Sequence, residues 1–311
     1  MDDLSSLESI AVSGATGFIG GHLVERLVAA GARPLLLART PRAGAFAGKT
    51  VEWGELDLLD SRAIDEVLKR ARPRTLFHLA GTRGGGDAAH APAACARLNV
   101  AATVHLLEAA EQWGVNRIVI LGSAEEYGPQ EGPLGEELAL LPTSAYGISK
   151  AAATRLAQVM HAETGCPVVV LRPFTVYGPG QPPDMFVASA LAAALLGHPF
   201  EMSAGEQKRD LVFVEDVVEA LLVAARTPGL EGRVVNVGTG QAHPLREVAA
   251  RIWELTGSKA PLRVGARGTS ADQLHDTWAD TRLARRLLGW DPRFDLDHGL
   301  METIRRSTGR V

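Results

Sequence analysis

The stretch SIAVSGATGFIGGHLVERL, residues 9–27, joins an apolar run to a helical pattern through a turn with three evenly spaced glycines. Residues 9–14 are predicted to form a buried strand, and residues 18–31 the helix that follows. Gly14, Gly17 and Gly20 then lie where a backbone can approach a pyrophosphate, whose charge faces the free N–H groups of the helix. The alternative is a tight turn that serves only close helix packing, because the spacing is Gly-x-x-Gly-x-x-Gly and not Gly-x-Gly-x-x-Gly.

Strand and helix patterns alternate through the first two thirds of the chain. Short apolar runs occur at 33–39, 75–81, 117–123 and 167–173, and helical patterns separate them at 61–71, 96–114 and 144–165. This alternation predicts an α/β fold, a doubly wound parallel sheet of the Rossmann type, with a smaller C-terminal substrate-binding lobe. We expect a nucleotide-binding domain over 1–174 that also receives 211–240, and a lobe built from 175–210 and 241–311.

Composition excludes several classes of function. The 311 residues are 46% hydrophobic and 22% charged, with a net charge of −4 and no basic block, so no nucleic-acid partner is expected. Cys95 and Cys166 lack metal-ligand spacing, and no metal site is expected. The longest apolar stretch, 188–197, is too short to span a bilayer, so no membrane partner is expected. The N-terminus lacks the pattern of an export signal, which predicts a cytoplasmic protein.

A second group of residues suggests proton-transfer chemistry. Tyr146 and Lys150 are four residues apart in a predicted helix, which puts both side chains on one face. A nearby ammonium favours the charged form of a phenol, so Lys150 is expected to lower the pKa of Tyr146 toward use as a general acid and base. Ser123, after a predicted strand, is placed to hydrogen-bond the same substrate oxygen. The alternative for Tyr-x-x-x-Lys alone is an amphipathic surface pair.

The order and spacing of these motifs resemble a known family. Gly14 to Gly20, His78-Leu-Ala, Asn99, Ser123 in GSAEEYG and Tyr146-x-x-x-Lys150 are similar to the extended short-chain dehydrogenases/reductases. The resemblance continues through LRPFTVYGPGQ, KRDLVFVEDV and VVNVGTG to LLGW, and so covers nearly the whole chain. This branch contains nucleotide-sugar epimerases, 4,6-dehydratases and 4-ketoreductases.

The resemblance implies roles for individual residues. Ser123, Tyr146 and Lys150 would be the catalytic group, with Tyr146 passing a proton to or from the C4 oxygen of a sugar while hydride moves between C4 and a nicotinamide. Cofactor contacts would come from two groups of residues, the glycine turn with its neighbours and a set of later positions: Gly14, Gly17, Phe18, Ile19, Gly20, Arg39, Asp57, Leu58, Leu79, Ala80, Asn99, Tyr146, Lys150 and Pro173. Asp57 and Leu58 match an adenine-binding Asp-Leu pair of the family.

The end of the second predicted strand bears on which cofactor binds. An acidic residue there would accept hydrogen bonds from the ribose of NAD, but this chain has Arg39, with Arg42 nearby and no carboxylate. An arginine suits the 2′-phosphate of NADP, so we predict that NADP(H) is preferred and that NAD(H) is also accepted.

Besides Ser123, substrate contacts are implied at three further positions. Arg209 matches an arginine that contacts the nucleotide diphosphate in this branch, and Arg267 is a second candidate; both have the alternative of plain surface arginines. Thr175 replaces the Asn of LRxxNVYGP, which puts that contact in doubt.

The reaction type depends on residues 123–128. Ala124 replaces the Asp of a common 4,6-dehydratase class, while Glu125 keeps the position of the Glu in the GDP-mannose class and is a candidate catalytic base. Ser-x-Glu-Glu-Tyr-Gly is most similar to the GDP-4-keto-6-deoxymannose reductases. The leading hypothesis is therefore NADPH-dependent reduction of a nucleotide-linked 4-keto-6-deoxyhexose at C4.

Three alternatives remain open: a UDP-glucose/UDP-galactose type 4-epimerase, a GDP-mannose-type 4,6-dehydratase, and a non-catalytic cofactor-binding module. The resemblance also implies a homodimer formed through the helices at 96–113 and 145–162, which are rich in alanine. The alternative is that both alanine faces rest on the sheet.

Overall fold

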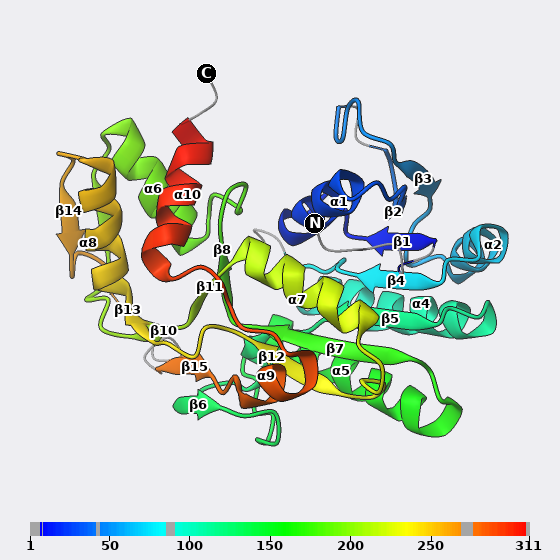
Figure 1. Ribbon diagram of the computed structural model, residues 1–311. Coiled ribbons are helices and arrows are strands. Elements are labelled where there is room, and N and C mark those ends of the chain that lie inside the picture. The colour runs from blue at the N-terminus through cyan, green and yellow to red at the C-terminus, as the bar shows by residue number, and fades with distance from the viewer. Residues whose placement is uncertain (1–6, 8, 42–43, 85–90, 269–275, 309–311) are drawn as a thin grey trace. The chain divides into compact units, whose positions relative to one another are not determined.

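The computed structural model describes residues 7, 9–41, 44–84, 91–268 and 276–308. A seven-stranded sheet organises the first part of the chain, with the strand order β12-β7-β5-β4-β1-β2-β3. The pairings from β3 to β7 are all parallel, so the predicted doubly wound α/β fold is confirmed (Figure 1). The strands of this sheet are β1 (Ile10–Ser13), β2 (Leu35–Ala38), β3 (Glu52–Glu55), β4 (Thr75–His78), β5 (Arg117–Leu121), β7 (Val168–Pro173) and β12 (Val234–Val237).

Helices connect most of the successive strands, as the alternation predicts, although β3 follows β2 with no helix described between them. They are α1 (Phe18–Ala29), α2 (Ser61–Ala71), α3 (Ala91–Cys95), the π-helix η1 (Ala96–Ala101), α4 (Ala102–Gln112), the 3₁₀-helix η2 (Ala124–Glu126), α5 (Ala145–Thr164) and α7 (Val214–Arg226). Helices α2, α4 and α5 pack beside one another over one face of the sheet. The order of strands reverses at β1, and α1 accordingly lies over the other face, as does α7 (Figure 1).

The hydrophobic core between the sheet and α2, α4 and α5 comes from alternating strand residues and from one stripe of each helix. Leu76 and Ile118 point into it from the strands, and Leu68 and Leu106 from the helices, all fully buried. Each such side chain contributes roughly 1.5–3 kcal/mol relative to an exposed one, so the core fixes the strand ends at which the site is built.

One helix expected to be continuous is interrupted. The pattern at 96–114 predicts a single α-helix, but residues Ala96–Ala101 form a π-helical segment before α4 begins. Such segments are rare and often occur at functional sites. Here the segment carries Asn99, which is almost fully buried.

The chain divides into two compact units. The first contains Met1–Gly128, Pro142–Arg172 and Val218–Val235, and the second Pro129–Leu141, Pro173–Val217 and Asn236–Val311. The expected boundaries differ from this division at 129–141, 173–174, 211–217 and 236–240, which cluster with the second unit. The segment 129–141 belongs there because its strand β6 (Gly132–Leu134) pairs with β15 (Thr277–Ala279).

The second unit is built from small sheets and helices. Its four-stranded sheet has the order β13-β10-β15-β6, and two strand pairs, β11-β8 and β14-β9, accompany it. The remaining elements are β8 (Thr175–Tyr177), α6 (Phe186–Leu196), β9 (Phe200–Met202), β10 (Lys208–Arg209), β11 (Leu211–Phe213), β13 (His243–Pro244), α8 (Leu245–Thr256), β14 (Leu262–Val264), α9 (Arg282–Leu288) and α10 (Leu296–Thr308).

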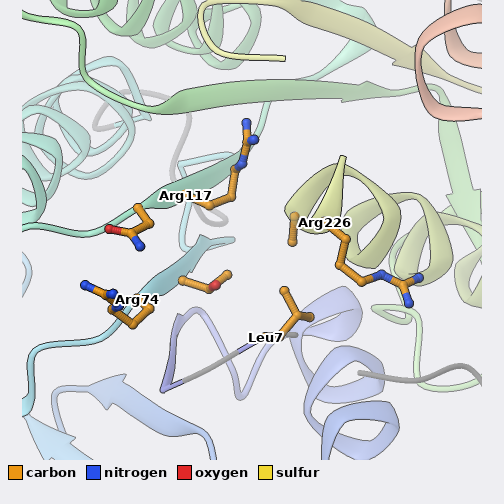
Figure 2. Close-up of a pocket in the computed structure, with 7 residues that line it drawn as sticks. Leu7, Arg74, Arg117 and Arg226 are labelled. Atoms are coloured by element: carbon orange, nitrogen blue, oxygen red, sulfur yellow. The ribbon is translucent and has the colours of Figure 1, made fainter. Parts of the chain in front are cut away.

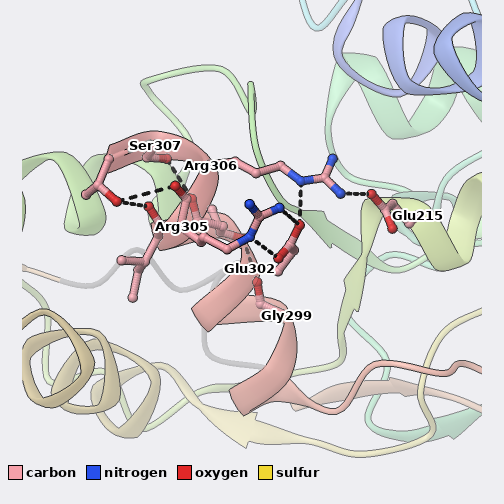
Figure 3. A network of polar contacts seen from close by, with 9 residues as sticks. Glu215, Gly299, Glu302, Arg305, Arg306 and Ser307 are labelled. Carbon is pink, nitrogen blue, oxygen red and sulfur yellow. Dashed lines mark hydrogen bonds and ion pairs between the residues drawn. The ribbon is translucent and has the colours of Figure 1, made fainter. Parts of the chain in front are cut away.

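Polar networks hold this second unit together. The buried carboxylate of Asp210 accepts hydrogen bonds from the backbone N–H groups of Thr239, Gly240 and Ala279 and from the hydroxyl of Thr239. On α10, Glu302 accepts from Arg305 and Arg306, and Arg306 also pairs with Glu215 at the start of α7 (Figure 3). Among the described residues, no helix is both long and apolar enough to cross a membrane.

Candidate active site

The glycine turn after β1 is packed too closely to accept side chains. Gly14 has a φ of +75°, and a Cβ there would lie 2.5 Å from the backbone nitrogen of Ala80. A Cβ on Gly20 would lie 2.1 Å from the carbonyl oxygen of Gly14. Gly17 is the N-cap of α1 and supplies no side-chain cap to its first N–H groups. The turn thus offers a bare backbone and an uncapped helix start, which suits a cofactor pyrophosphate.

This turn meets the end of a neighbouring strand. Leu79 and Ala80 follow β4, which pairs with β1, and both lie against Gly14. Phe18 and Ile19 form the first turn of α1. The structure therefore brings these predicted cofactor residues together where the strand order reverses, the usual ligand position in open α/β sheets.

Ser123, Tyr146 and Lys150 gather at the same edge of the sheet. Ser123 follows β5 and is the N-cap of η2, where its hydroxyl accepts from the backbone N–H of Glu125 at 3.2 Å. Tyr146 and Lys150 lie one helical turn apart near the start of α5, whose N-cap is Ser144. Lys150 Nζ donates to the carbonyl oxygen of Leu121 at 2.7 Å and lies 5.9 Å from the centre of the Tyr146 ring.

The acidity of Tyr146 differs from the expectation. Burial raises the pKa of Tyr146 to about 12, and this effect outweighs the cation Arg83 and the hydrogen bond from Ser123, which lower it. The prediction that Lys150 lowers the pKa of Tyr146 is therefore wrong for the protein with no ligand bound. Burial also lowers the pKa of Lys150 to about 8, opposed by the charge of Glu126, which weakens the ammonium as a partner.

Arg83 is a site residue that the sequence did not indicate. It follows β4 in the loop after Ala80, and its guanidinium carbon lies 5.0 Å from the centre of the Tyr146 ring. Arg83 also pairs with Glu125, whose second carboxylate oxygen accepts from the Ser144 hydroxyl at 3.1 Å. Glu125, the candidate base, therefore lies beside Tyr146 within an ion pair.

Asn99 anchors the loop that carries Arg83. Its side-chain oxygen accepts from the Thr82 N–H, and its amide donates to the Thr82 carbonyl and to Ser149 Oγ, each at 2.8 Å. Asn99 is thus placed between the loop after β4 and α5. A Cβ on Gly81 would lie 3.2 Å from Asn99 Oδ1 and 3.3 Å from Lys150 Nζ, so both side chains border this glycine.

A buried polar chain connects Asn99 to β1. Thr103 Oγ1 donates to the Asn99 carbonyl at 2.8 Å and therefore accepts from Nε2 of His78 at 2.9 Å. Nδ1 of His78 is then the acceptor for the Ser13 hydroxyl at 2.6 Å. Burial, with a smaller effect of Lys150, lowers the pKa of His78 to about 3, consistent with a neutral ring that links two parts of the site.

The buried carboxylate of Glu126 fixes the backbone of Ser123. Its carboxylate accepts from the Ser123 N–H at 2.8 Å and from Nη2 of Arg172 at 2.8 Å. Glu126 is fully buried and Arg172 is 2% exposed. Ser123 and Glu126 together form a capping box at the start of η2, which the S-x-x-E spacing could have revealed in the sequence.

The other predicted cofactor residues lie at the ends of β2 and β3. Arg39 directly follows β2 and is exposed, while Arg42 lies outside the described residues. Asp57 accepts from the Leu59 N–H at 3.0 Å, within its own turn, and Leu58 is buried in the core.

Ser123 belongs to the first unit, whereas the other predicted substrate residues and Pro173 belong to the second unit. Thr175 lies in β8 and donates its N–H to the Asp210 carbonyl at 2.9 Å. Arg209 lies in β10, and Arg267 is exposed beyond β14. Within the described part of the chain, no group of three His, Cys, Asp or Glu side chains could hold a metal ion.

A small hollow lies at the opposite edge of the sheet. It has a volume of about 230 Å³ and is lined by Leu7, Arg74, Thr75, Asn116, Arg117, Ala225 and Arg226 (Figure 2). Thr75 and Arg117 are the first residues of β4 and β5, so this hollow faces the amino ends of the strands. Ligands of parallel sheets bind at the carboxyl ends, and the hollow is not the catalytic site.

The parallel sheet, the glycine turn and the group of Ser123, Tyr146 and Lys150 are together typical of a dinucleotide-binding α/β oxidoreductase. A model of the NAD dependent epimerase/dehydratase family matches residues 10–238, and the chain belongs to this family. It is an enzyme of the extended short-chain dehydrogenase/reductase type that uses a pyridine nucleotide, which confirms the family inferred from the motifs.

Relatives extend over nearly the whole chain. An uncharacterised UDP-glucose epimerase of Bacillus subtilis, YtcB, is 31% identical over 95% of this chain and 96% of its own. The structure of MoeE5 with UDP-glucose and NAD is 36% identical, with a TM-score of 0.85 over 96% and 98% of the two chains, and MoeE5 has also been solved with UDP-glucuronic acid and NAD. A Thermotoga maritima UDP-glucose 4-epimerase with UDP-glucose is 27% identical, with a TM-score of 0.87 over 96% and 98%.

Proposed function

We propose that this enzyme is a UDP-sugar 4-epimerase, which inverts the configuration of the sugar at C4. The observation that carries the chemistry is the grouping of Ser123, Tyr146 and Lys150 beside the glycine turn. The choice among reactions rests on the relatives, because epimerases recur among them and three related proteins have been solved with a bound UDP-sugar. They favour the epimerase alternative over the GDP-4-keto-6-deoxymannose reductase hypothesis.

Each residue of the group has a role in moving one proton. Tyr146 takes the proton from the C4 hydroxyl when the sugar is oxidised and returns it when the sugar is reduced. Ser123 hydrogen-bonds the same oxygen and holds it near the phenol. Lys150 lies next to Tyr146 with its ammonium fixed by the Leu121 carbonyl, a position from which it would hold the cofactor ribose. A bound pyridine nucleotide supplies the reversible hydride acceptor, held by Gly14, Gly17 and Gly20.

The cofactor proposal has two parts. NAD is bound in solved structures of relatives, among them MoeE5 and a Thermus thermophilus UDP-glucose 4-epimerase, and an epimerase that regenerates its cofactor in each cycle needs no NADPH supply. Exposed Arg39 at the end of β2 supports the separate prediction that NADP(H) also binds, and binds more tightly than NAD(H). Asp57 and Leu58 would hold the adenine, and Asn99 acts by fixing the loop after β4.

Dehydration is less well supported by the residues near Tyr146. Ala124 takes the position at which a common class of dehydratases carries an acid. Glu125, the remaining candidate base, is bound by Arg83 and by Ser144. A carboxylate in an ion pair is a weaker base toward a substrate carbon, so elimination of water is the second choice.

We assign the nucleotide end of the substrate to the second unit. Arg209 and Arg267 would bind the diphosphate through paired N–H groups, and Thr175 would contact the sugar. UDP-glucose and UDP-glucuronic acid, the ligands of the MoeE5 structures, are the first two substrates to test.

We also propose a homodimer formed through α5. Ile148, Leu156 and Val159 are 53%, 40% and 45% exposed on this helix, at spacings that put them on one side. Exposed apolar side chains in such a stripe are typical of a contact surface. A dimer mass by light scattering, lost in an Ile148→Asp/Val159→Asp variant, supports the proposal; a monomer mass for the unmodified chain contradicts it.

The test of function compares products. The enzyme with NAD is incubated separately with UDP-glucose and UDP-glucuronic acid, and proton NMR follows the C4 epimers. We expect epimer formation from one of them, and a loss of about 100- to 10,000-fold in kcat for Tyr146→Phe. Tyr177→Phe, which removes one 3.3 Å hydrogen bond to Leu296 in the second unit, serves as the control. Steady oxidation of NADPH by a nucleotide 4-keto sugar, without epimerisation of either UDP-sugar, would establish the reductase instead.

A further inference from the structure

Arg83 and Glu125 form an ion pair directly beside the Tyr146 ring. The guanidinium of Arg83 lies over the ring at 5.0 Å from its centre while Nη2 of Arg83 contacts a carboxylate oxygen of Glu125. The Arg83 cation thus pairs with the Glu125 carboxylate and is also close enough to attract the phenol oxygen of Tyr146 when that oxygen loses its proton.

Both members of the pair are held in place from their own elements. Glu125 lies in η2 and accepts from the Ser144 hydroxyl, which also caps the helix that carries Tyr146. Arg83 follows Thr82, whose backbone N–H and carbonyl are both bound by the amide of Asn99. The cation and the carboxylate are therefore fixed relative to the phenol.

The charged and polar groups around Tyr146 come from three elements. Arg83 comes from the loop after β4, Ser123, Glu125 and Glu126 come from the segment after β5, and Lys150 comes from α5 itself. Arg83 has the largest lowering influence on the pKa of Tyr146, the Ser123 hydrogen bond lowers it further, and Glu125 and Glu126 raise it. The charge of Glu126 is balanced by the buried cation of Arg172. Arg83 and Glu125 are therefore the exposed charges near Tyr146 whose effect on its pKa can be tested by substitution.

We propose that the Arg83–Glu125 pair sets the acidity of Tyr146, with Arg83 stabilising the deprotonated phenol and Glu125 weakening that effect. Arg83 is in this view a positioning residue that acts through the tyrosine. The proposal rests on the proposed function, since it assumes that Tyr146 exchanges a proton with the substrate. Its physical basis is that a cation over an aromatic face favours negative charge on the ring, and that a carboxylate bound to the same cation reduces its field.

The pair predicts shifts of opposite sign for its two members. Arg83→Met removes the cation and raises the titration midpoint of Tyr146, while Glu125→Gln frees the cation and lowers the midpoint. Each shift should be roughly half a pH unit or more, as expected for one charge about 5 Å away across a mostly solvated gap. A pair that only braces the loop would give no shift, or shifts of one sign.

The experiment uses protein in which the three tyrosines are replaced by 3-fluorotyrosine, a more acidic phenol, so that fluorine NMR follows each ionisation separately. The Tyr146 signal is assigned as the one missing from Tyr146→Phe. The variants are Arg83→Met, Arg83→Lys, Glu125→Gln and the double variant Arg83→Met/Glu125→Gln. The controls are Arg33→Met and Glu52→Gln, from a surface pair at 3.1 Å with side chains 63% and 50% exposed, close to the 56% and 38% of Arg83 and Glu125.

We expect an upward shift for Arg83→Met, a downward shift for Glu125→Gln, a smaller shift for the double variant, near-normal behaviour for Arg83→Lys and none for the controls. Equal midpoints in all variants, or a changed KM with an unchanged Tyr146 midpoint, would overturn the proposal. Circular dichroism at each pH verifies folding, and Glu125→Gln tests the pair even if Arg83→Met unfolds. Because this titration needs no substrate, it stays decisive if no UDP-sugar is turned over; where turnover occurs, the alkaline limb of kcat/KM should move in the same directions.

Discussion

The carbonyl oxygen of Gly14 occupies the place that a side chain on Gly20 would need, 2.1 Å from the position of its Cβ. This oxygen belongs to the backbone, which cannot move aside as a flexible side chain would. The first turn of α1 is therefore pressed against the end of β1, and this contact gives the cofactor turn its shape.

Gly20→Ala should distort this turn. We expect a loss of roughly 1–3 kcal/mol in the free energy of unfolding, together with weaker NAD binding, because one methyl group must displace backbone. Gly21→Ala is the control in the same helix: its Cβ would lie 3.9 Å from the nearest atom outside its own helical turn, so the change should be neutral or slightly stabilising. Urea unfolding and calorimetric titration with NAD measure both effects; equal behaviour of the two variants would refute the packing argument.

The buried pair of Glu126 and Arg172 should be sensitive to the loss of one partner. Arg172→Met leaves the Glu126 charge buried with little compensation, and we expect a cost of about 3–5 kcal/mol in unfolding free energy. The double variant Glu126→Leu/Arg172→Met should recover part of this cost, since neither charge is then left buried. The exposed pair Arg33–Glu52 is the reference, with an expected effect of about 0–1 kcal/mol. A double variant as unstable as the sum of both single variants would contradict the coupling.

His78 should make stability depend on pH. The folded pKa of His78, about 3, lies below the ordinary value of 6.5, so the unfolded chain binds the proton more readily between these values. Its contribution is fully present above pH 6.5 and is lost as the pH falls from 6.5 toward 3, at up to about 1.4 kcal/mol per pH unit. Urea unfolding at pH 7, 6 and 5 should show this slope, and His78→Asn should reduce it. Exposed His198→Gln is the control, and an unchanged slope in His78→Asn would refute the assignment.

Arg39 should govern the choice between the two cofactors. Arg39→Asp replaces the cation after β2 with a carboxylate, which repels a 2′-phosphate and accepts hydrogen bonds from a 2′-hydroxyl. We expect NADPH affinity to fall by roughly ten- to a hundredfold, while NADH affinity stays level or rises. Arg33→Asp, just before β2, is the control. Tighter binding of NADH than NADPH to the unmodified chain would contradict the predicted preference.

Patterns that depend on local periodicity were readable from the sequence. The glycine turn, the alternation of strands and helices and the Tyr146–Lys150 spacing all follow from residues near each other in the chain. Strand β3 was missed because its sequence, EWGE, has no apolar run. Its buried residue is Gly54, which lies against side chains of β2 and α2, while Trp53 is half-buried. The π-helical turn at Asn99 was missed because its pattern continues smoothly into α4.

The charges that act on Tyr146 could not be predicted in the same way. Arg83 is a lone arginine before a glycine-rich stretch, and only the close approach of β4 and η2 brings it to Tyr146 and Glu125. The effect of Lys150 was misjudged for a related reason: spacing along a helix shows that two groups are near, but not how strongly burial opposes their ionisation.

The most direct test of the proposed 4-epimerase follows a deuterium label at C4 of UDP-glucose, or of UDP-glucuronic acid if that is the substrate, in ordinary water with NAD. An epimerase that oxidises and reduces C4 within one active site should return the label to C4, so the epimer should carry deuterium there and external NADH or NADPH should not be consumed. Loss of the label from the product, or turnover that consumes one reduced cofactor for each sugar formed, would contradict the proposed function.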